Sequence, residues 1–143
     1  MKFDQAGNLY LADGANNRIR KIDGNGIITT VAGNGSSGFS GDGAAAIAAR
    51  LNNPDDIAVD ASGNLYIADL GNNRVRMVTP GGIISTYAGT GTFGSTGDGG
   101  SAASAQLNAL AGLALDSTGW LYVTLASPGA SASAGSLPRQ PEP

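Results

Sequence analysis

The side chains of this sequence that could do chemistry are carboxylates, amides and arginines, because its 143 residues include no histidine and no cysteine. Lacking histidine, the chain has neither the commonest general base nor the commonest zinc ligand. Lacking cysteine, it can form no disulfide framework and no thiolate nucleophile. Ser-His-Asp and Cys-His catalysis are therefore excluded by composition. We expect a non-enzymatic protein with no cofactor and no metal.

Two polar groups of the same type stand out. They are Asp13, Asn16, Asn17 and Arg18, and Asp69, Asn72, Asn73 and Arg74. One interpretation is a ligand-binding rim. The other is structural: Asp and Asn bond the local backbone to build a turn, and the arginine bridges to a nearby carboxylate. Their repetition favours the structural interpretation, since a single active site needs no copies.

A second repeated group is Gly41-Asp42-Gly43, which returns as Gly97-Asp98-Gly99. A calcium loop requires several oxygen ligands at close spacing, and Asp42 stands alone among glycines. The pattern instead favours a turn in which each aspartate caps the short helix that follows.

The acidic pair Asp55-Asp56 has Ala111-Gly112 as its counterpart, so it is not part of the repeat. A position that differs between copies could mark a binding function. A solvated loop at the start of the second unit explains the pair equally simply, and the sequence favours the loop.

The elements that position these groups recur with a period of 56 residues. Gly7-Asn8-Leu9-Tyr10 returns at 63–66 and, with one change, at 119–122. Aligning residues 7–56 with 63–112 without a gap gives 25 identities in 50 positions. A period of this length is typical of solenoids and propellers.

Each unit contains four short β-rich stretches separated by turn residues. In the second unit we expect strands at 57–60, 65–69, 74–79 and 83–88, with apolar or small residues on both faces. Four antiparallel strands whose two faces both pack on neighbours form one propeller blade. The sequence therefore predicts an all-β chain of about two four-stranded blades plus the start of a third.

Between the blades lie linkers at about residues 33–56 and 89–112. Each begins with Gly and Ser or Thr and ends in a segment of helical composition, for which we expect one or two helical turns. The predicted propeller part covers residues 1–124, with blades at 1–32, 57–88 and 113–124. Residues 125–143 contain four of the six prolines and are predicted to be a disordered tail.

The overall charge is -3, with 8 basic and 11 acidic side chains. No concentrated basic patch exists, so a nucleic-acid surface is not expected. No apolar run reaches the length of a transmembrane helix, and the N-terminal residues lack the apolar core of a signal peptide.

The motif Gly-Asn-Leu-Tyr-Ile-Ala-Asp at 63–69, followed by Asn-Asn-Arg-Val-Arg at 72–76, resembles the NHL repeat. Ala-Gly-x-Gly, Gly-Asp-Gly and Leu-Asn-x-Pro in the long linkers are similar to those of large bacterial NHL proteins and of the teneurin propeller. The resemblance implies a β-propeller, usually of about six blades, that binds protein, RNA or other ligands at its rims. It also favours an extracytoplasmic or secreted location.

The resemblance leaves two functions open. We expect a binding scaffold for a protein or small ligand at the propeller rim. The alternative is part of a lactonase- or lyase-like propeller enzyme, whose metal ligands, often histidines, would lie outside this chain. Because two blades and part of a third cannot close a ring, the neighbouring blades come either from a larger chain, which we expect, or from a homo-oligomer.

Overall fold

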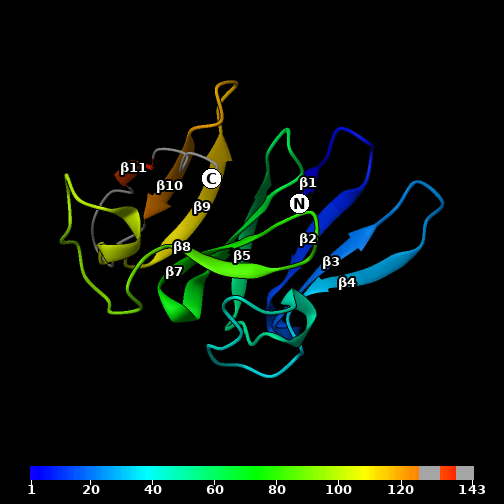
Figure 1. Cartoon of the computed structure of the whole chain (residues 1–143), viewed down its shortest axis with the longest axis horizontal. Helices are drawn as coiled ribbons and strands as arrows, with labels where there is room; N and C mark the ends of the chain where they lie inside the picture. Colours follow the sequence, from blue (N-terminus) through cyan, green and yellow to red (C-terminus); the bar gives the residue numbers. More distant parts are fainter. Residues whose placement is uncertain (126–132, 138–143) are drawn as a thin grey trace.

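The chain folds into three antiparallel β-sheets arranged side by side, in a computed structural model that describes residues 1–125 and 133–137 (Figure 1). The first sheet has the order β1 (Lys2–Phe3), β2 (Leu9–Asp13), β3 (Arg18–Ile22) and β4 (Ile28–Ala32). The second has the order β5 (Pro54–Val59), β6 (Leu65–Asp69), β7 (Arg74–Val78) and β8 (Ile84–Ala88). These are the two predicted four-stranded blades.

Each blade is a meander, so that every strand pairs with the next one along the chain. In the second blade Leu65 lies opposite Val78, and Asp69 lies opposite Arg74. The turn between these strands contains the 3₁₀ helix η3 (Leu70–Asn72) and ends at Asn73, whose φ of 51° is left-handed. The first blade has the same turn, formed by η1 (Gly14–Asn16) and Asn17. Asparagine suits this position because it tolerates left-handed backbone better than most residues.

The first strand of each blade lies on the inside of the assembly. Strand β5 packs against β2 of the first blade on one side and against β9 (Leu110–Leu115) of the third on the other. This is the arrangement of consecutive propeller blades, in which inner strands gather around a common axis.

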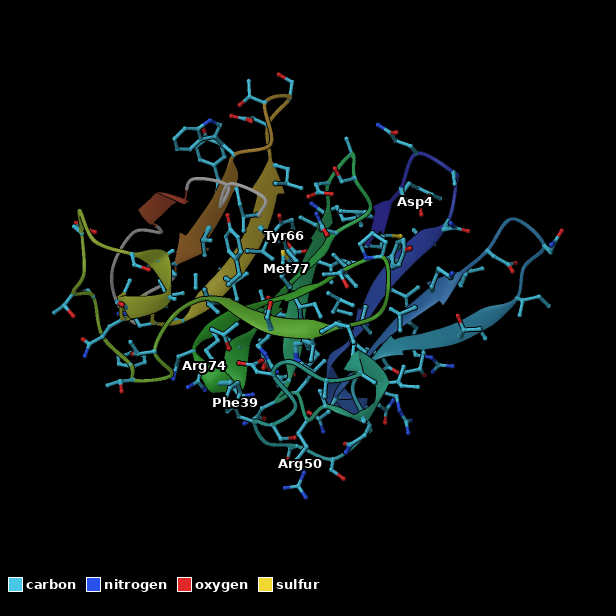
Figure 2. All side chains as sticks on the ribbon, viewed as in Figure 1. Asp4, Phe39, Arg50, Tyr66, Arg74 and Met77 are labelled. Atoms are coloured by element: carbon cyan, nitrogen blue, oxygen red, sulfur yellow. The ribbon has the colours of Figure 1, made fainter. Side chains whose placement is uncertain are left out.

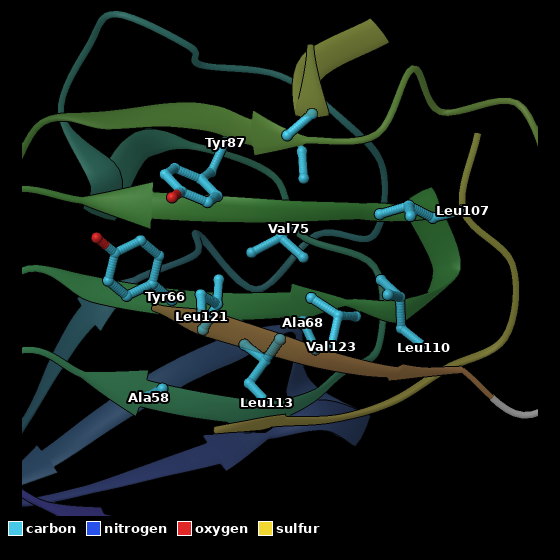
Figure 3. Packing of buried hydrophobic residues seen from close by; sticks show 12 residues of the cluster. Ala58, Tyr66, Ala68, Val75, Tyr87, Leu107, Leu110, Leu113, Leu121 and Val123 are labelled. Atoms are coloured by element: carbon cyan, nitrogen blue, oxygen red, sulfur yellow. The ribbon is translucent and has the colours of Figure 1, made fainter. Parts of the chain in front are cut away.

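Two apolar cores lie between the blades rather than within them. One core joins the first and second blades and includes Ile19, Leu51, Ile57 and Ile67, all 0 % exposed. The other joins the second and third blades, where Tyr66 meets Tyr87 edge-on with ring centroids 5.0 Å apart (Figure 3). The second blade thus buries both faces, as its apolar composition on both sides predicts.

The linkers contain short 3₁₀ helices, η2 (Ala46–Ala48) and η4 (Ala102–Ser104), each a single turn where one or two were expected. The predicted aspartate caps are wrong. The capping positions are Ala45 and Ser101, and neither makes a side-chain capping bond. The Asp42 carboxylate binds other groups, described below, and both capping residues come three positions after their aspartate.

The third blade consists of β9, β10 (Leu121–Leu125) and β11 (Ser133–Leu137), in the order β11-β10-β9. Leu125 ends β10, and residues 133–137 form a strand, which differs from the disordered tail expected over 125–143. Pairing satisfies backbone groups of β10 that would otherwise be an open edge. The rest of that tail, 126–132 and 138–143, lies outside the described residues.

Strand β9 begins at Leu110 and β5 at Pro54, each three residues before the blade start expected from the sequence. A bulge between Pro54 and Asp56 lets strand β5 continue past the point where the alternation of its side chains between the two faces breaks. Within the described ranges, no helix is long and apolar enough to cross a membrane.

Candidate binding site on the linker rim

The two linkers and the turns between the second and third strands form a surface that we call the linker rim (residues 14–17, 33–53, 70–73 and 89–109). Hydrogen bonds connect these segments. The Gly71 N–H donates to the Asn52 carbonyl over 2.8 Å, and the Asn53 N–H donates to Asn17 Oδ1 over 2.9 Å. The linker rim is therefore a bonded surface rather than a set of separate loops.

A buried arginine, Arg76, connects the second blade to the first linker. Its side chain is 0 % exposed, and its two terminal nitrogens bind two carboxylates. Nη2 donates to Asp42 Oδ1 over 2.8 Å, and Nη1 donates to Asp69 Oδ2 over 3.3 Å. It also donates to the carbonyls of Ser40 (3.0 Å) and Arg50 (3.3 Å). Four partners compensate the cost of burying the guanidinium charge.

Asp69 and Asp42 are both fully engaged by this network. Asp69 accepts the Asn52 N–H at Oδ1 over 2.8 Å and the Asn72 amide at Oδ2 over 2.7 Å. Burial raises the pKa of the Asp69 carboxyl, against the lowering effect of these donors and of Arg76. Asp42 Oδ2 accepts the Thr86 hydroxyl over 2.6 Å. Asp42 therefore joins the linker to β8 rather than capping η2.

The asparagines singled out from the sequence reach from the turns to the linkers. Asn72 donates to the Gly38 carbonyl over 2.8 Å. Asn17 and Asn73 donate to the carbonyls of Gly35 and Gly91, each over 3.4 Å. Asn16 donates to Asp13 Oδ1 over 3.0 Å. These side chains hold neighbouring segments together, and most of their bonds leave the turn that contains them.

Among the described residues, the arginine of each Asn-Asn-Arg group does not bridge to a carboxylate, contrary to the structural interpretation of the sequence. Arg74 donates to the Thr90 carbonyl over 2.8 Å. The carboxylates pair with the arginine two residues later, as Arg76 with Asp69 and as Arg20 Nη1 with Asp13 Oδ2 at 3.6 Å. The Arg74 guanidinium lies beside Gly91 and not beside a carboxylate of the described residues, because Gly91 has no side chain and leaves room for it. A Cβ at Gly91 would lie 2.6 Å from Arg74 Cζ.

Phe39 is a site residue that sequence reasoning missed. Its ring is 40 % exposed, and Arg74 Cζ lies 3.6 Å from the ring centroid, in cation–π contact. Arg76 Cζ lies 4.6 Å from the same centroid. Figure 2 shows Phe39 beside Arg74, with Arg50 farther along the same rim. Among the described residues, the exposed guanidinium of Arg50 has no hydrogen-bond or ion-pair partner.

The signal that could have found these residues was the difference between the two repeats. Phe39 corresponds to Ser95 and Arg50 to Gln106, by the 56-residue spacing. The first linker therefore carries an aromatic ring and an exposed cation that the second linker lacks at those positions.

The acidic pair lies in strand β5 and not in a solvated loop, which corrects the favoured interpretation. Asp56 Oδ2 accepts the Leu113 N–H over 2.8 Å and so fastens β5 to β9. A Cβ at Gly112 would lie 3.5 Å from Asp56 Oδ2, an ordinary van der Waals distance, so this bond does not depend on the glycine. Asp55 is exposed at the bulge.

The opposite ends of the blades carry a different aspartate, at the turn between the first and second strands. Asp4, Asp60 and Asp116 each accept the N–H of the residue four positions later over 2.8–2.9 Å. The bond from Asn8 lowers the pKa of Asp4, and the bond from Thr118 lowers the pKa of Asp116. Burial, and then the Asp4 charge, raise the pKa of Tyr10.

The described residues contain no group of three or more acidic side chains placed to hold a metal ion. The chemistry that the linker rim does offer is recognition, through an aromatic face, an exposed guanidinium and a supporting network of buried bonds.

Comparison with known proteins finds similar repeats. The model of the teneurin NHL domain family matches residues 35–96. Human Teneurin-4 is 42% identical over 85 residues, covering 50% of this chain and 3% of that protein. Chicken Teneurin-1 is 41% identical over 73 residues, covering 44% and 3%. The plant protein Suppressor of quenching 1 from Arabidopsis thaliana is 36% identical over 73 residues, covering 50% and 7%. The chain thus spans only a small part of each relative.

Solved structures confirm the fold. A structural genomics protein of unknown function from Bacteroides thetaiotaomicron superimposes with a TM-score of 0.72 at 24% identity, covering 82% of this chain and 29% of that one. An auxiliary nutrient binding protein from the same organism gives 0.68 at 23%, covering 85% and 33%. Virginiamycin B lyase from Staphylococcus aureus gives 0.53 at 14%, covering 97% and 41%. The 56-residue units of this chain are similar to the repeats of the teneurin NHL domain, and they fold as blades of a β-propeller.

Proposed function

We propose that this chain is a non-catalytic binding module that presents its linker rim to a protein or small-molecule ligand. The observation that carries the proposal is the exposed ring of Phe39, stacked on Arg74 and located on the same rim as Arg50, whose guanidinium has no partner in the described part of the chain. Aromatic residues and arginine contribute most of the energy at binding interfaces when they are held in place before binding.

A buried side chain of the second blade packs against the Phe39 ring and holds it in place. Arg76 contacts the ring and is itself fixed by Asp42 and Asp69. Because Asn72 also donates to the Gly38 carbonyl, the first linker is anchored on both sides of Phe39. Little side-chain freedom is then lost on binding, which favours affinity. The ring and the Arg50 guanidinium suit a ligand that combines a flat or apolar group with a carboxylate or phosphate.

One solved structure with this fold is that of an auxiliary nutrient binding protein, which is consistent with binding. That likeness concerns the fold, so the proposal depends on the residues of the rim. The alternative is part of a propeller enzyme; a lyase also has this fold.

The test begins with a binding screen, using the fluorescently labelled chain on arrays of acidic peptides and of charged glycans. Each hit is then measured with the variants Phe39→Ser and Arg50→Gln, which install the residues of the second repeat. We expect Phe39→Ser to weaken binding at least about tenfold. The matched control is Phe93→Ser, since Phe93 is 60% exposed in the other linker.

An equal loss in the Phe93→Ser control, or no effect of Phe39→Ser on any hit, would contradict a site at Phe39. Turnover of a lactone and ester panel with Mg²⁺, Ca²⁺ or Zn²⁺ added would contradict the non-catalytic assignment and support the enzyme alternative.

A further inference from the structure

The first and second blades present the same residue types toward the side from which a linker approaches. On the second blade these residues are Asp69, Arg76, Ile84 and Thr86. Residues exactly one 56-residue period earlier are Asp13, Arg20, Ile28 and Thr30 on the first blade, identical in all four types. We call the first-blade set the blade-1 socket and the second-blade set the blade-2 socket.

The blade-2 socket shows what such a surface binds. Its side chains hold the Asp42 carboxylate through Arg76 and Thr86. Its backbone holds the residues after Asp42: the Gly43 N–H donates to the Ile84 carbonyl over 2.7 Å, and the Ile84 N–H donates to the Ala44 carbonyl over 3.0 Å. An extended segment with glycine, aspartate and glycine in sequence is thus recognised by charge and by strand addition.

The blade-1 socket has the same groups in an open state among the described residues. Arg20 has a side-chain exposure of 28%, against 0% for Arg76, and its one ion-pair partner is Asp13 at 3.6 Å. Ile28 is 47% exposed, against 0% for Ile84. Strand β4, which contains Ile28, is an edge of its sheet. By analogy with Ile84, the Ile28 backbone groups point away from β3 and can pair with an added segment.

We propose that the blade-1 socket binds an extended Gly-Asp-Gly segment of the inter-blade linker type, supplied from outside the described residues. The aspartate of that segment binds Arg20 and Thr30, and the residues after it add to β4 at Ile28. Charge complementarity and the filled blade-2 socket of the same chain both support this occupant. The inference is independent of Phe39, so each proposal can fail without the other.

The test uses a fluorescein-labelled peptide with the sequence of residues 36–52 and the complete chain, followed by fluorescence anisotropy. We expect saturable one-to-one binding. The Asp42→Asn version of the peptide should bind at least about tenfold more weakly, because the carboxylate is the group that pairs with Arg20.

On the chain, Arg20→Gln and Thr30→Val should each weaken binding of the unaltered peptide. Lys21→Gln is the matched control, because it removes one positive charge from the neighbouring position of β3, on the opposite face of the strand. Circular dichroism of each variant shows whether the blades remain folded. If Arg20→Gln does not fold, Thr30→Val still tests the proposal.

Three outcomes would overturn the proposal: no saturable binding, equal affinity for the two peptides, or equal losses in Arg20→Gln and Lys21→Gln. Light scattering measures the oligomeric state of the chain and provides one more test. If the chain alone forms a discrete oligomer that Asp98→Asn dissolves, the occupant is a second copy and not a free linker segment.

Discussion

The two linkers carry the same Gly-Asp-Gly motif and place it in different surroundings. In the first linker Asp42 binds Arg76 and Thr86 on the adjoining blade. In the second linker Asp98 is exposed, and among the described residues its carboxylate has no hydrogen-bond or ion-pair partner. One period after Arg76 the sequence has Ala132 instead of arginine. The motif therefore builds a junction only where the following blade supplies the cation.

A motif that needs no neighbour behaves differently. The aspartate of the turn between the first and second strands makes its backbone bond in all three blades. Donor and acceptor are four residues apart, so the bond forms whatever lies beside the blade. The contrast separates repeat motifs that fold a blade from repeat motifs that join blades, and the following predictions test that separation.

The largest expected effect is on the joining network. Arg76→Met should lower the free energy of unfolding by about 3–5 kcal/mol, because it leaves the buried Asp69 carboxylate without its cation. The matched variant Arg20→Met, in the open blade-1 socket, should cost about 0–1 kcal/mol because the pair with Asp13 is partly solvated. Urea unfolding followed by circular dichroism measures both.

Comparable losses in the two variants would show that Arg76 is no more important to stability than its open counterpart, and that the network does not join the blades. Because burial raises the pKa of Asp69, its protonation should relieve part of the cost in Arg76→Met as the pH falls.

The sequence was sufficient for the features that depend on residues close together in the chain. The four-strand units, the turns at Asn17 and Asn73 and the single helical turns in the linkers are as predicted. Alternation and turn residues encode these features locally.

The sequence was insufficient for features that depend on packing between the repeat units. Arg76 had no distinguishing mark in the sequence, and its burial follows only from the meeting of linker and blade. Asp56 looked like part of a loop because its partner, the Leu113 N–H, is 57 residues away. The pairing of β11 with β10 was missed because a Ser-, Ala- and Gly-rich segment has low strand propensity, and an open sheet edge can recruit it regardless.

An effect of intermediate size on stability is expected from the aspartates of the two Gly-Asp-Gly motifs. Asp42→Asn should destabilise the chain by about 1.5–3 kcal/mol, the typical value for a hydrogen bond to a charged group, because it weakens the bond to Arg76. Asp98→Asn should stay within about 0.5 kcal/mol of the unaltered chain, as surface changes do. Thermal unfolding at pH 7 compares them. A loss for Asp98→Asn as large as for Asp42→Asn would mean that the second junction is also held by its aspartate.

The smallest expected effect concerns the turn aspartates, which should behave alike in the first and third blades. The pKa of Asp4 and that of Asp116 are both lowered, because hydrogen bonds from their own turns favour the charged carboxylate. A lowered folded-state pKa means that the stabilisation is present above the unfolded-state pKa of about 3.9 and is lost as the pH falls through the folded-state value. Carboxyl chemical shifts followed by NMR from pH 6 to 2 should give midpoints below about 3.9 for both residues. Since one blade has four strands and the other three, a midpoint lowered in Asp4 alone would show that this turn depends on the completeness of its sheet, and the division between folding and joining motifs would not hold.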